Sequence, residues 1–244
     1  MIYKQKNALK SGLWQLNGEK LSVTGGMVFH KARGIMLYIA TAIAIITTLI
    51  LLQTIEPATA HHPMGGQTPS NLWEGLLSGI GHPMIGMDHL AFVVAIGLIA
   101  APVAKGVLIP LCFIATAMLG TGIHLLSIDL PLVEIAIAIS VVAFGVMLAL
   151  KQKLSTPILV ILGATAGIFH GYAYGEAIIG AEITPLLAYL IGFSAIQLLI
   201  ALLAMKFGEL VNHNWQNQSF SLMRFLGLVI SAIGAVFFIS SFAS

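Results

Sequence analysis

Long apolar segments separated by short polar stretches follow one another along most of the chain. Six of them lie after residue 80, over residues 84–101, 106–126, 131–150, 156–176, 184–205 and 222–242. Each is close to the ~20 apolar residues that a helix needs to cross a bilayer. The pattern predicts an all-α integral membrane protein built on a bundle of six transmembrane helices.

The composition narrows the class of protein further. The 244 residues are 58% hydrophobic and 8% charged, whereas soluble domains carry about 25% charged residues. The basic residues are spread along the chain, so we expect a lipid bilayer as a partner and no nucleic acid. Cys112 is the single cysteine, which excludes a disulfide framework and a Cys-x-x-Cys metal site.

A further apolar segment, residues 35–52, follows a basic N-terminal region and precedes an Ala-Thr-Ala stretch that ends at Ala60. This order predicts a signal peptide over residues 1–60, cleaved after Ala60, and a transmembrane domain over residues 61–244. An uncleaved first transmembrane helix is the alternative, because the apolar segment is nearly long enough to span a bilayer.

Cleavage after Ala60 would place two histidines, His61 and His62, at the start of the mature chain. A terminal amine and a neighbouring imidazole are both nitrogen ligands that a transition metal accepts. The other interpretation is a short tail with two solvated histidines.

The basic residues also predict the orientation in the membrane. When the mature N-terminus is placed outside, all eleven lysines and arginines fall on the cytoplasmic side. This distribution follows the positive-inside rule. We therefore expect a protein of the bacterial inner (plasma) membrane, with the mature N- and C-termini on the periplasmic side.

Ionisable residues gather near the predicted outer ends of the helices. Such residues are costly inside a membrane and mostly mark sites of function. Seven potential metal ligands share this depth: His82, Asp88, His89, His124, Glu134, His170 and Glu176. We predict that they converge on one metal ion. The alternative for the cluster at 82–89 is a set of polar residues that merely lie at the headgroup boundary.

The spacing of the first three ligands predicts an irregular helix. His82 and His89 are seven residues apart, which on a regular helix is a separation of about 10 Å. Pro83 and Gly86 lie between them and can break the helix, so we expect a broken or re-entrant first helix. The alternative is a rigid relay that hands one ion from His82 to Asp88 and His89.

Glycines recur every four residues in the segment 156–176, at positions 163, 167, 171 and 175. This spacing gives a helix a smooth ridge, and we interpret it as a surface for close helix packing. His170 and Tyr174 share a face of the same helix. Imidazoles and carboxylates without thiolates favour Ni²⁺, Co²⁺ or Zn²⁺ over Cu(I), and the residue types do not choose among the three.

The first motif resembles a known family. Residues 82–89 read His-Pro-Met-Ile-Gly-Met-Asp-His, which is similar to the His-Pro-x-x-Gly-x-Asp-His signature of the hydrogenase and urease accessory proteins HupE/UreJ, a family of nickel permeases. Residues 131–134 and 170–176 resemble later motifs of that family. The resemblance covers residues 61–244. It implies a cleaved signal and six helices.

For function, the resemblance implies that five of the candidate residues matter for nickel transport: His82, Asp88, His89, Glu134 and Glu176. It also implies that the ion serves hydrogenase or urease maturation proteins. This chain has Tyr174 where some relatives carry a second histidine, so cobalt stays open as the transported ion.

We therefore expect a secondary transporter that takes Ni²⁺ from the periplasm to the cytoplasm, with no organic cofactor and no enzymatic activity. The chain has no Gly-x-x-x-x-Gly-Lys-Ser/Thr motif, so it carries no built-in ATPase of that type. Two other classes remain as alternatives. One is a metal-binding accessory protein that does not transport, and the other is an intramembrane metalloenzyme that activates water.

Overall fold

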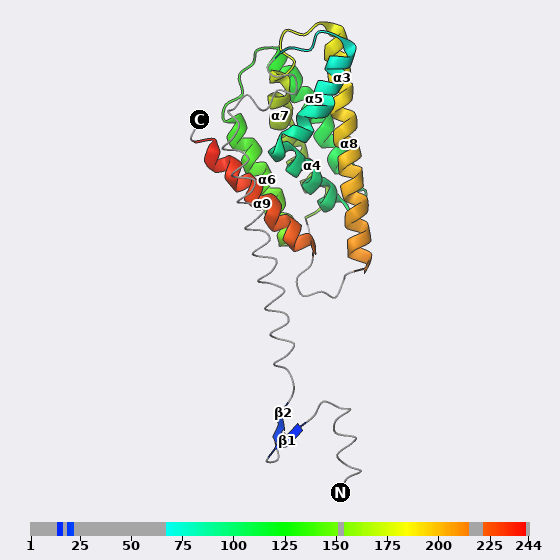
Figure 1. Cartoon of the computed structure of the whole chain (residues 1–244), viewed down its shortest axis with the longest axis vertical. Coiled ribbons are helices and arrows are strands. Elements are labelled where there is room, and N and C mark those ends of the chain that lie inside the picture. Colours follow the sequence, from blue (N-terminus) through cyan, green and yellow to red (C-terminus); the bar gives the residue numbers. More distant parts are fainter. Residues whose placement is uncertain (1–13, 17–18, 22–66, 151–153, 215–221, 243–244) are drawn as a thin grey trace. The chain divides into compact units, whose positions relative to one another are not determined.

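The computed structural model describes residues 14–16, 19–21, 67–150, 154–214 and 222–242. From residue 67 on, the described chain is helical, as the apolar pattern predicts (Figure 1). The helices are α3 (Leu72–Ile85), α4 (Met87–Ala100), α5 (Leu108–Leu125), α6 (Val133–Ala149), α7 (Thr156–Glu176), α8 (Ile183–Asn214) and α9 (Leu222–Ser240).

Two short strands precede the helices and belong to a separate compact unit, residues 1–45. Strands β1 (Trp14–Leu16) and β2 (Glu19–Leu21) pair antiparallel. The all-α prediction did not include them, although Asn-Gly, the dipeptide between them in the sequence, is favoured in two-residue hairpin connections. The predicted cleavage after Ala60 and the residues His61 and His62 lie outside the described residues.

The first helix is broken, as predicted, and the predicted span 84–101 corresponds to α4 and the last residues of α3. α3 and α4 have 14 residues each, about 21 Å of helix, and they are bent by 78° at the break between them. Helices α5, α7, α8 and α9 are each long and apolar enough to cross a membrane, while α6 is a shorter apolar helix of 17 residues. The predicted count of six spans is therefore reached only when the broken pair and α6 are both included.

Helices α5 and α7 pack closely and run in the same direction. Gly167 of α7 lies against Phe113 of α5, and Gly175, two turns further on, lies against His124. A side chain at either glycine would overlap α5, so the glycines let the two helices approach. This contact confirms the interpretation of the glycine ridge as a packing surface.

Helix α8 lies along both halves of the broken pair. Gly75 of α3 packs against Pro185 near the start of α8, and Gly97 of α4 packs against Ala201 further along it. One continuous helix of 32 residues therefore supports both sides of the break. Helix α9 packs antiparallel to α6, in contacts that include Gly145 with Gly227.

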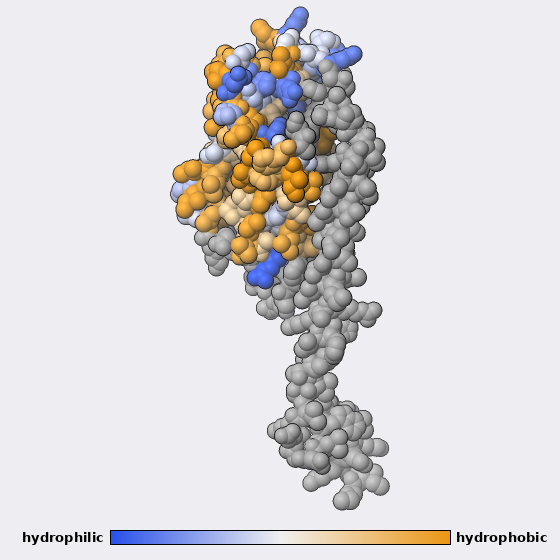
Figure 2. All heavy atoms as spheres, turned by 90° about the vertical axis from the view of Figure 1, so that its left-hand side faces the viewer, coloured by the Kyte–Doolittle hydropathy of each residue, from blue (hydrophilic) through white to orange (hydrophobic). Residues whose placement is uncertain are grey.

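The directions of the helices bring chemically different residues to the two ends of the bundle. His124, Glu134 and Glu176 lie at the end where α5 and α7 finish and α6 begins. The lysines and the arginine that the structure describes from residue 67 on lie at the opposite end: Lys105, Lys206 and Arg224. Figure 2 shows a mostly hydrophobic surface between a hydrophilic upper end and a hydrophilic patch near the lower end of the bundle. The basic residues of this part of the chain thus gather at one end of the bundle, and the side of the membrane that this end faces stays a prediction.

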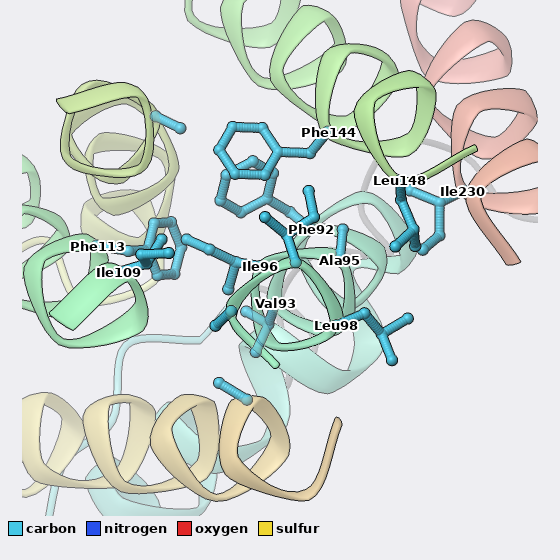
Figure 3. Packing of buried hydrophobic residues seen from close by; sticks show 14 of the residues in the cluster. Phe92, Val93, Ala95, Ile96, Leu98, Ile109, Phe113, Phe144, Leu148 and Ile230 are labelled. Atoms are coloured by element: carbon cyan, nitrogen blue, oxygen red, sulfur yellow. The ribbon is translucent and has the colours of Figure 1, made fainter. Parts of the chain in front are cut away.

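The largest apolar core begins directly after the histidines along α4. Phe92 is fully buried, and its ring lies 5.0 Å from that of Phe113 and 4.8 Å from that of Phe144 (Figure 3). Ile96 and Ile109 continue the core and are also fully buried. The polar cluster is thus bordered on the side toward the basic residues by tightly packed apolar side chains.

Candidate functional site

The candidate site is built around the break between α3 and α4. Gly86 ends α3 with an extended backbone (φ −67°, ψ 100°), and its N–H donates to the carbonyl of His82 at 3.1 Å. Pro83 in the last turn of α3 has no N–H to donate, which weakens the helix there. The chain turns at Gly86 and starts α4 at once, as the Pro83 and Gly86 spacing predicted.

Asp88 lies at the buried start of α4. It is 3% exposed, and its Oδ1 accepts the N–H of His89 at 2.8 Å. The N-cap residue, Gly86, has no side chain to cap the helix, so Asp88 satisfies an amide that the first turn leaves unpaired. Its negative charge also offsets the positive end of the α4 dipole.

Three histidines from three helices form a chain of contacts in which His89, next to Asp88 in the sequence, lies against both His82 and His170. His82, His89 and His170 are 3%, 4% and 0% exposed. The rings of His82 and His89 have centroids 5.8 Å apart, much closer than the spacing of about 10 Å on a straight helix. Nδ1 of His89 lies 2.8 Å from Nδ1 of His170. The bend at Gly86 therefore brings together ligands that a regular helix would separate.

Polar residues that the sequence did not single out complete the cluster. Ser140 of α6 lies 3.0 Å from Nε2 of His170, and the hydroxyl of Tyr189 on α8 lies 3.2 Å from Nδ1 of His82. Gln197 is a polar residue in the otherwise apolar middle of α8, and its Oε1 lies 3.5 Å from the hydroxyl of Tyr174. The signal for these residues is their polarity within long apolar segments, with Tyr189 and Gln197 eight residues apart on one helical face.

Tyr174 lies at the centre of the cluster. Its ring is fully buried and contacts both histidines of the break, with centroids 5.1 Å from His82 and 4.6 Å from His89. Its backbone carbonyl accepts the hydroxyl of Tyr189 at 2.7 Å. The aromatic ring shields the imidazoles, and the cluster is thus held by helices α3, α4, α6, α7 and α8.

The other predicted ligands lie outside this cluster. Glu134 and Glu176 are exposed at the ends of α6 and α7. His124 packs edge-to-face on Tyr172 with ring centroids 4.3 Å apart, and its buried Nδ1 has no hydrogen-bond partner. Among the described residues, no group of three or more His, Cys, Asp or Glu side chains is arranged to hold a metal ion. The seven-ligand site therefore stays a prediction, while the approach of the three histidines is a structural finding.

Most of the chain is similar in sequence to known proteins. Residues 49–237 match the family model described as HupE / UreJ protein. The chain is 31% identical over 172 residues to Protein HupE of Rhizobium leguminosarum bv. viciae, an alignment that covers 68% of this chain and 85% of that protein. No solved structure shows a significant match. The matched region contains the whole broken helix and its histidines, and the chain belongs to the HupE/UreJ family.

Proposed function

We propose that this protein is a secondary transporter that carries a divalent first-row metal ion from the periplasm to the cytoplasm of a bacterium. Nickel is the first candidate for the ion, with cobalt and then zinc as the alternatives. Membership of the HupE/UreJ family supports a role in supplying metal to hydrogenase or urease. The relative from Rhizobium leguminosarum bv. viciae carries the name HupE.

The observation that carries the proposal is the break at Gly86, which brings His82 and His89 together and leaves Asp88 buried at the start of α4. A carboxylate inside a membrane segment is expensive unless it is paired or binds a cation. Transporters build ion sites from discontinuous helices, where the ends of half-helices meet the ion. The C-terminal end of α3 carries partial negative charge, which adds to the attraction of Asp88 for a cation.

The ligand types fit a divalent transition metal. Imidazole nitrogens of His82 and His89 would replace part of the water shell of the ion, and Asp88 would offset its charge. His170 contacts His89 directly and completes the nitrogen-rich surroundings. Imidazole suits Ni²⁺, Co²⁺ and Zn²⁺, so selection among them depends on geometry more than on ligand type.

The three candidate ligands at the end of the bundle where α7 finishes would meet the ion before it reaches the break at Gly86. Glu134 and Glu176 lie at the ends of α6 and α7, where carboxylates attract cations from solution. His124 lies beside Gly175, one residue from Glu176. We assign these three residues to the entry of the ion, and the histidines of the break to its binding inside the membrane.

The rival classes predict different sites. An intramembrane hydrolase needs a metal with an open position for water, and the sequence contains no His-Glu-x-x-His motif. A non-transporting accessory protein would have no need for a break in a spanning helix with buried histidines on both sides of it. The broken span therefore favours transport.

The test is uptake of radioactive nickel into cells that express the wild type, Asp88→Asn or His89→Ala. Asparagine at 88 keeps an oxygen that can accept the His89 N–H and removes only the charge. Mutating a residue that only orients a metal ligand typically lowers affinity or activity by about 10–100-fold. Loss of a direct ligand should therefore reduce uptake by about 100-fold or more. Unlabelled Co²⁺ and Zn²⁺ in competition would rank the ions.

Asp129→Asn is the matched control, because Asp129 is an exposed carboxylate in the connection between α5 and α6. This variant should take up nickel like the wild type. Uptake that survives in both site variants, together with failed hydrogenase or urease maturation, would identify a non-transporting accessory protein instead.

A further inference from the structure

The hydroxyl of Tyr189 determines which nitrogen of His82 carries a hydrogen. This hydroxyl lies 2.7 Å from the backbone carbonyl of Tyr174, and a carbonyl can only accept. The single hydroxyl hydrogen is therefore used in that bond. The contact of 3.2 Å between the Tyr189 oxygen and Nδ1 of His82 then requires His82 to donate. Neutral His82 thus carries its hydrogen on Nδ1 and its lone pair on Nε2.

A second chain of hydrogen bonds acts in the same way on His89. The hydroxyl of Ser140 lies 2.6 Å from the carbonyl of Ile137 and donates to it. Ser140 must therefore accept from Nε2 of His170 at 3.0 Å, which leaves the lone pair of neutral His170 on Nδ1. That nitrogen accepts from Nδ1 of His89 at 2.8 Å. His89 thus also carries its lone pair on Nε2.

We propose that Tyr189 and Ser140 are positioning residues that fix His82 and His89 in the Nδ1–H tautomer, so that both offer Nε2 to the metal ion. Each chain ends on a backbone carbonyl, one in α7 and one in α6, so reversing either chain would break the bond between the hydroxyl and that carbonyl. A hydrogen on Nε2 would point a donor at the cation and prevent ligation. The inference rests on the proposed function for the identity of the ligand.

The proposal changes the role of His170. In the sequence-based prediction His170 is a direct ligand, whereas in this network its Nε2 donates to Ser140 and its Nδ1 accepts from His89. Metal-binding histidines commonly donate their second nitrogen to a partner that sets tautomer and ring orientation. His170 is such a partner for His89, and Tyr189 is the partner for His82.

Nitrogen-15 NMR of the full-length protein with labelled histidine in lipid nanodiscs reads the tautomers directly. In the metal-free wild type we expect Nδ1–H signals for His82 and His89 and an Nε2–H signal for His170. Tyr189→Phe should mix the tautomers of His82 and leave His89 unchanged. Ser140→Ala should do the reverse. An Nε2–H signal for His82 or His89 in the wild type would overturn the inference.

Nickel uptake gives a second readout that mere structural support would not produce. Mutating the hydrogen-bond partner of a metal-binding histidine typically lowers the affinity for the metal by about 10–100-fold. The nickel concentration at half-maximal uptake should therefore rise by this factor in Tyr189→Phe and Ser140→Ala, with the maximal rate kept. Ser140→Thr, which keeps the hydroxyl, should restore the wild-type value.

Matched controls remove the same atoms elsewhere. Tyr172→Phe keeps the aromatic ring that packs on His124, and Ser231→Ala removes a hydroxyl that bonds only to the Gly227 carbonyl of its own helix. Both should match the wild type in uptake. Unchanged half-saturation in Tyr189→Phe and Ser140→Ala would contradict the inference and leave the transport proposal standing. If the wild type takes up no metal, the transport proposal fails, and the NMR signals still decide the tautomers.

Discussion

The broken pair α3–α4 contributes two buried histidines and the continuous helix α7 contributes one, and both regions contain several glycines. Gly86 at the break nevertheless has a different role from the glycines of α7. In α7 the glycines repeat every turn and lie against α5, so they allow the two helices to pack at a short distance. Gly86 faces its own site: a Cβ there would lie 2.6 Å from Cδ2 of His89 and 3.3 Å from Oδ1 of Asp88. The comparison teaches that a glycine at a break makes room for functional side chains, while a glycine ridge makes room for a neighbouring helix.

The prolines of the two regions differ in the same way. Pro157 lies in the first turn of α7, where the missing N–H would have no intrahelical partner in any case. Pro83 lies in the last turn of α3, where a donor is needed for the helix to continue. The position within the helix, and not the residue type, decides whether a proline is tolerated or helps to end the element.

The largest effect should come from filling the ridge of α7. A Cβ at Gly171 would overlap the backbone of Ala117 on α5, so Gly171→Leu should force the two helices apart. Overpacking of this kind costs about 1–3 kcal/mol or more, and here the obstacle is rigid backbone, so we expect the upper end or beyond. The measurement is the unfolding midpoint of the purified protein in SDS titrations.

Gly122 of α5 offers the matched control. A Cβ at this position meets nothing within 4 Å, so Gly122→Leu should keep the wild-type midpoint. Equal midpoints for the variants at 171 and 122 would show that the contact between α5 and α7 is looser than the structure indicates.

A substitution at the break should affect transport more than stability. The backbone of Gly86 (φ −67°, ψ 100°) is open to any L-residue, so the main steric problem of Gly86→Ala is the overlap with the His89 ring, with a second tight contact at Oδ1 of Asp88. The displaced ring would lose its contact with His170, and we expect nickel uptake to fall by about tenfold or more. The unfolding midpoint should move less than in Gly171→Leu. Wild-type uptake in Gly86→Ala would disprove the role given to this glycine.

Local sequence features predict much of this fold because they act within one helix. The apolar segments place the helices, the repeat at 163–175 indicates a packing ridge, and Pro83 with Gly86 indicates the break. The sequence did not predict the helix ends that depend on packing against neighbouring helices. Helix α8 extends to Asn214, well past the predicted end at 205. Helix α6 begins at Val133, after the left-handed residue Leu132 (φ 57°), and not at residue 131.

The sequence likewise predicted part of the candidate site, its buried ionisable residues, and missed the partners from other helices. His82, Asp88, His89 and His170 are all buried, as expected for ionisable residues retained in a membrane segment. Ser140 and Tyr189 come from other helices, and a single sequence does not give the register between helices that brings them to the histidines. Burial also depends on that register, which is why exposed Glu134 and Glu176 had the same sequence signal as buried Asp88.

The smallest effect should come from the exposed start of α3, which can be compared with the buried start of α4. Asn71 is exposed, and its Oδ1 accepts the N–H of Glu74 at 3.0 Å. The sequence signature of a capping box is thus only half realised, because the Glu74 carboxylate bonds to Ser70. Asp88 also accepts an amide N–H at the start of α4, that of the next residue, His89, but it does so inside the protein.

Asn71→Ala should therefore lower the free energy of unfolding by about 1 kcal/mol, the usual cost of losing an N-cap, and leave nickel uptake unchanged. Asn71→Asp, which keeps an acceptor, should retain the wild-type midpoint and serves as the control. The two measurements separate two roles of a side chain that accepts an amide N–H at a helix start. At the exposed start of α3 it only stabilises the helix, and at the buried start of α4 it also holds a charge next to His89. A loss of uptake in Asn71→Ala that matched the loss in Asp88→Asn would mean that disturbing either end of the broken span is enough to disable transport, and the buried charge would then have no special role.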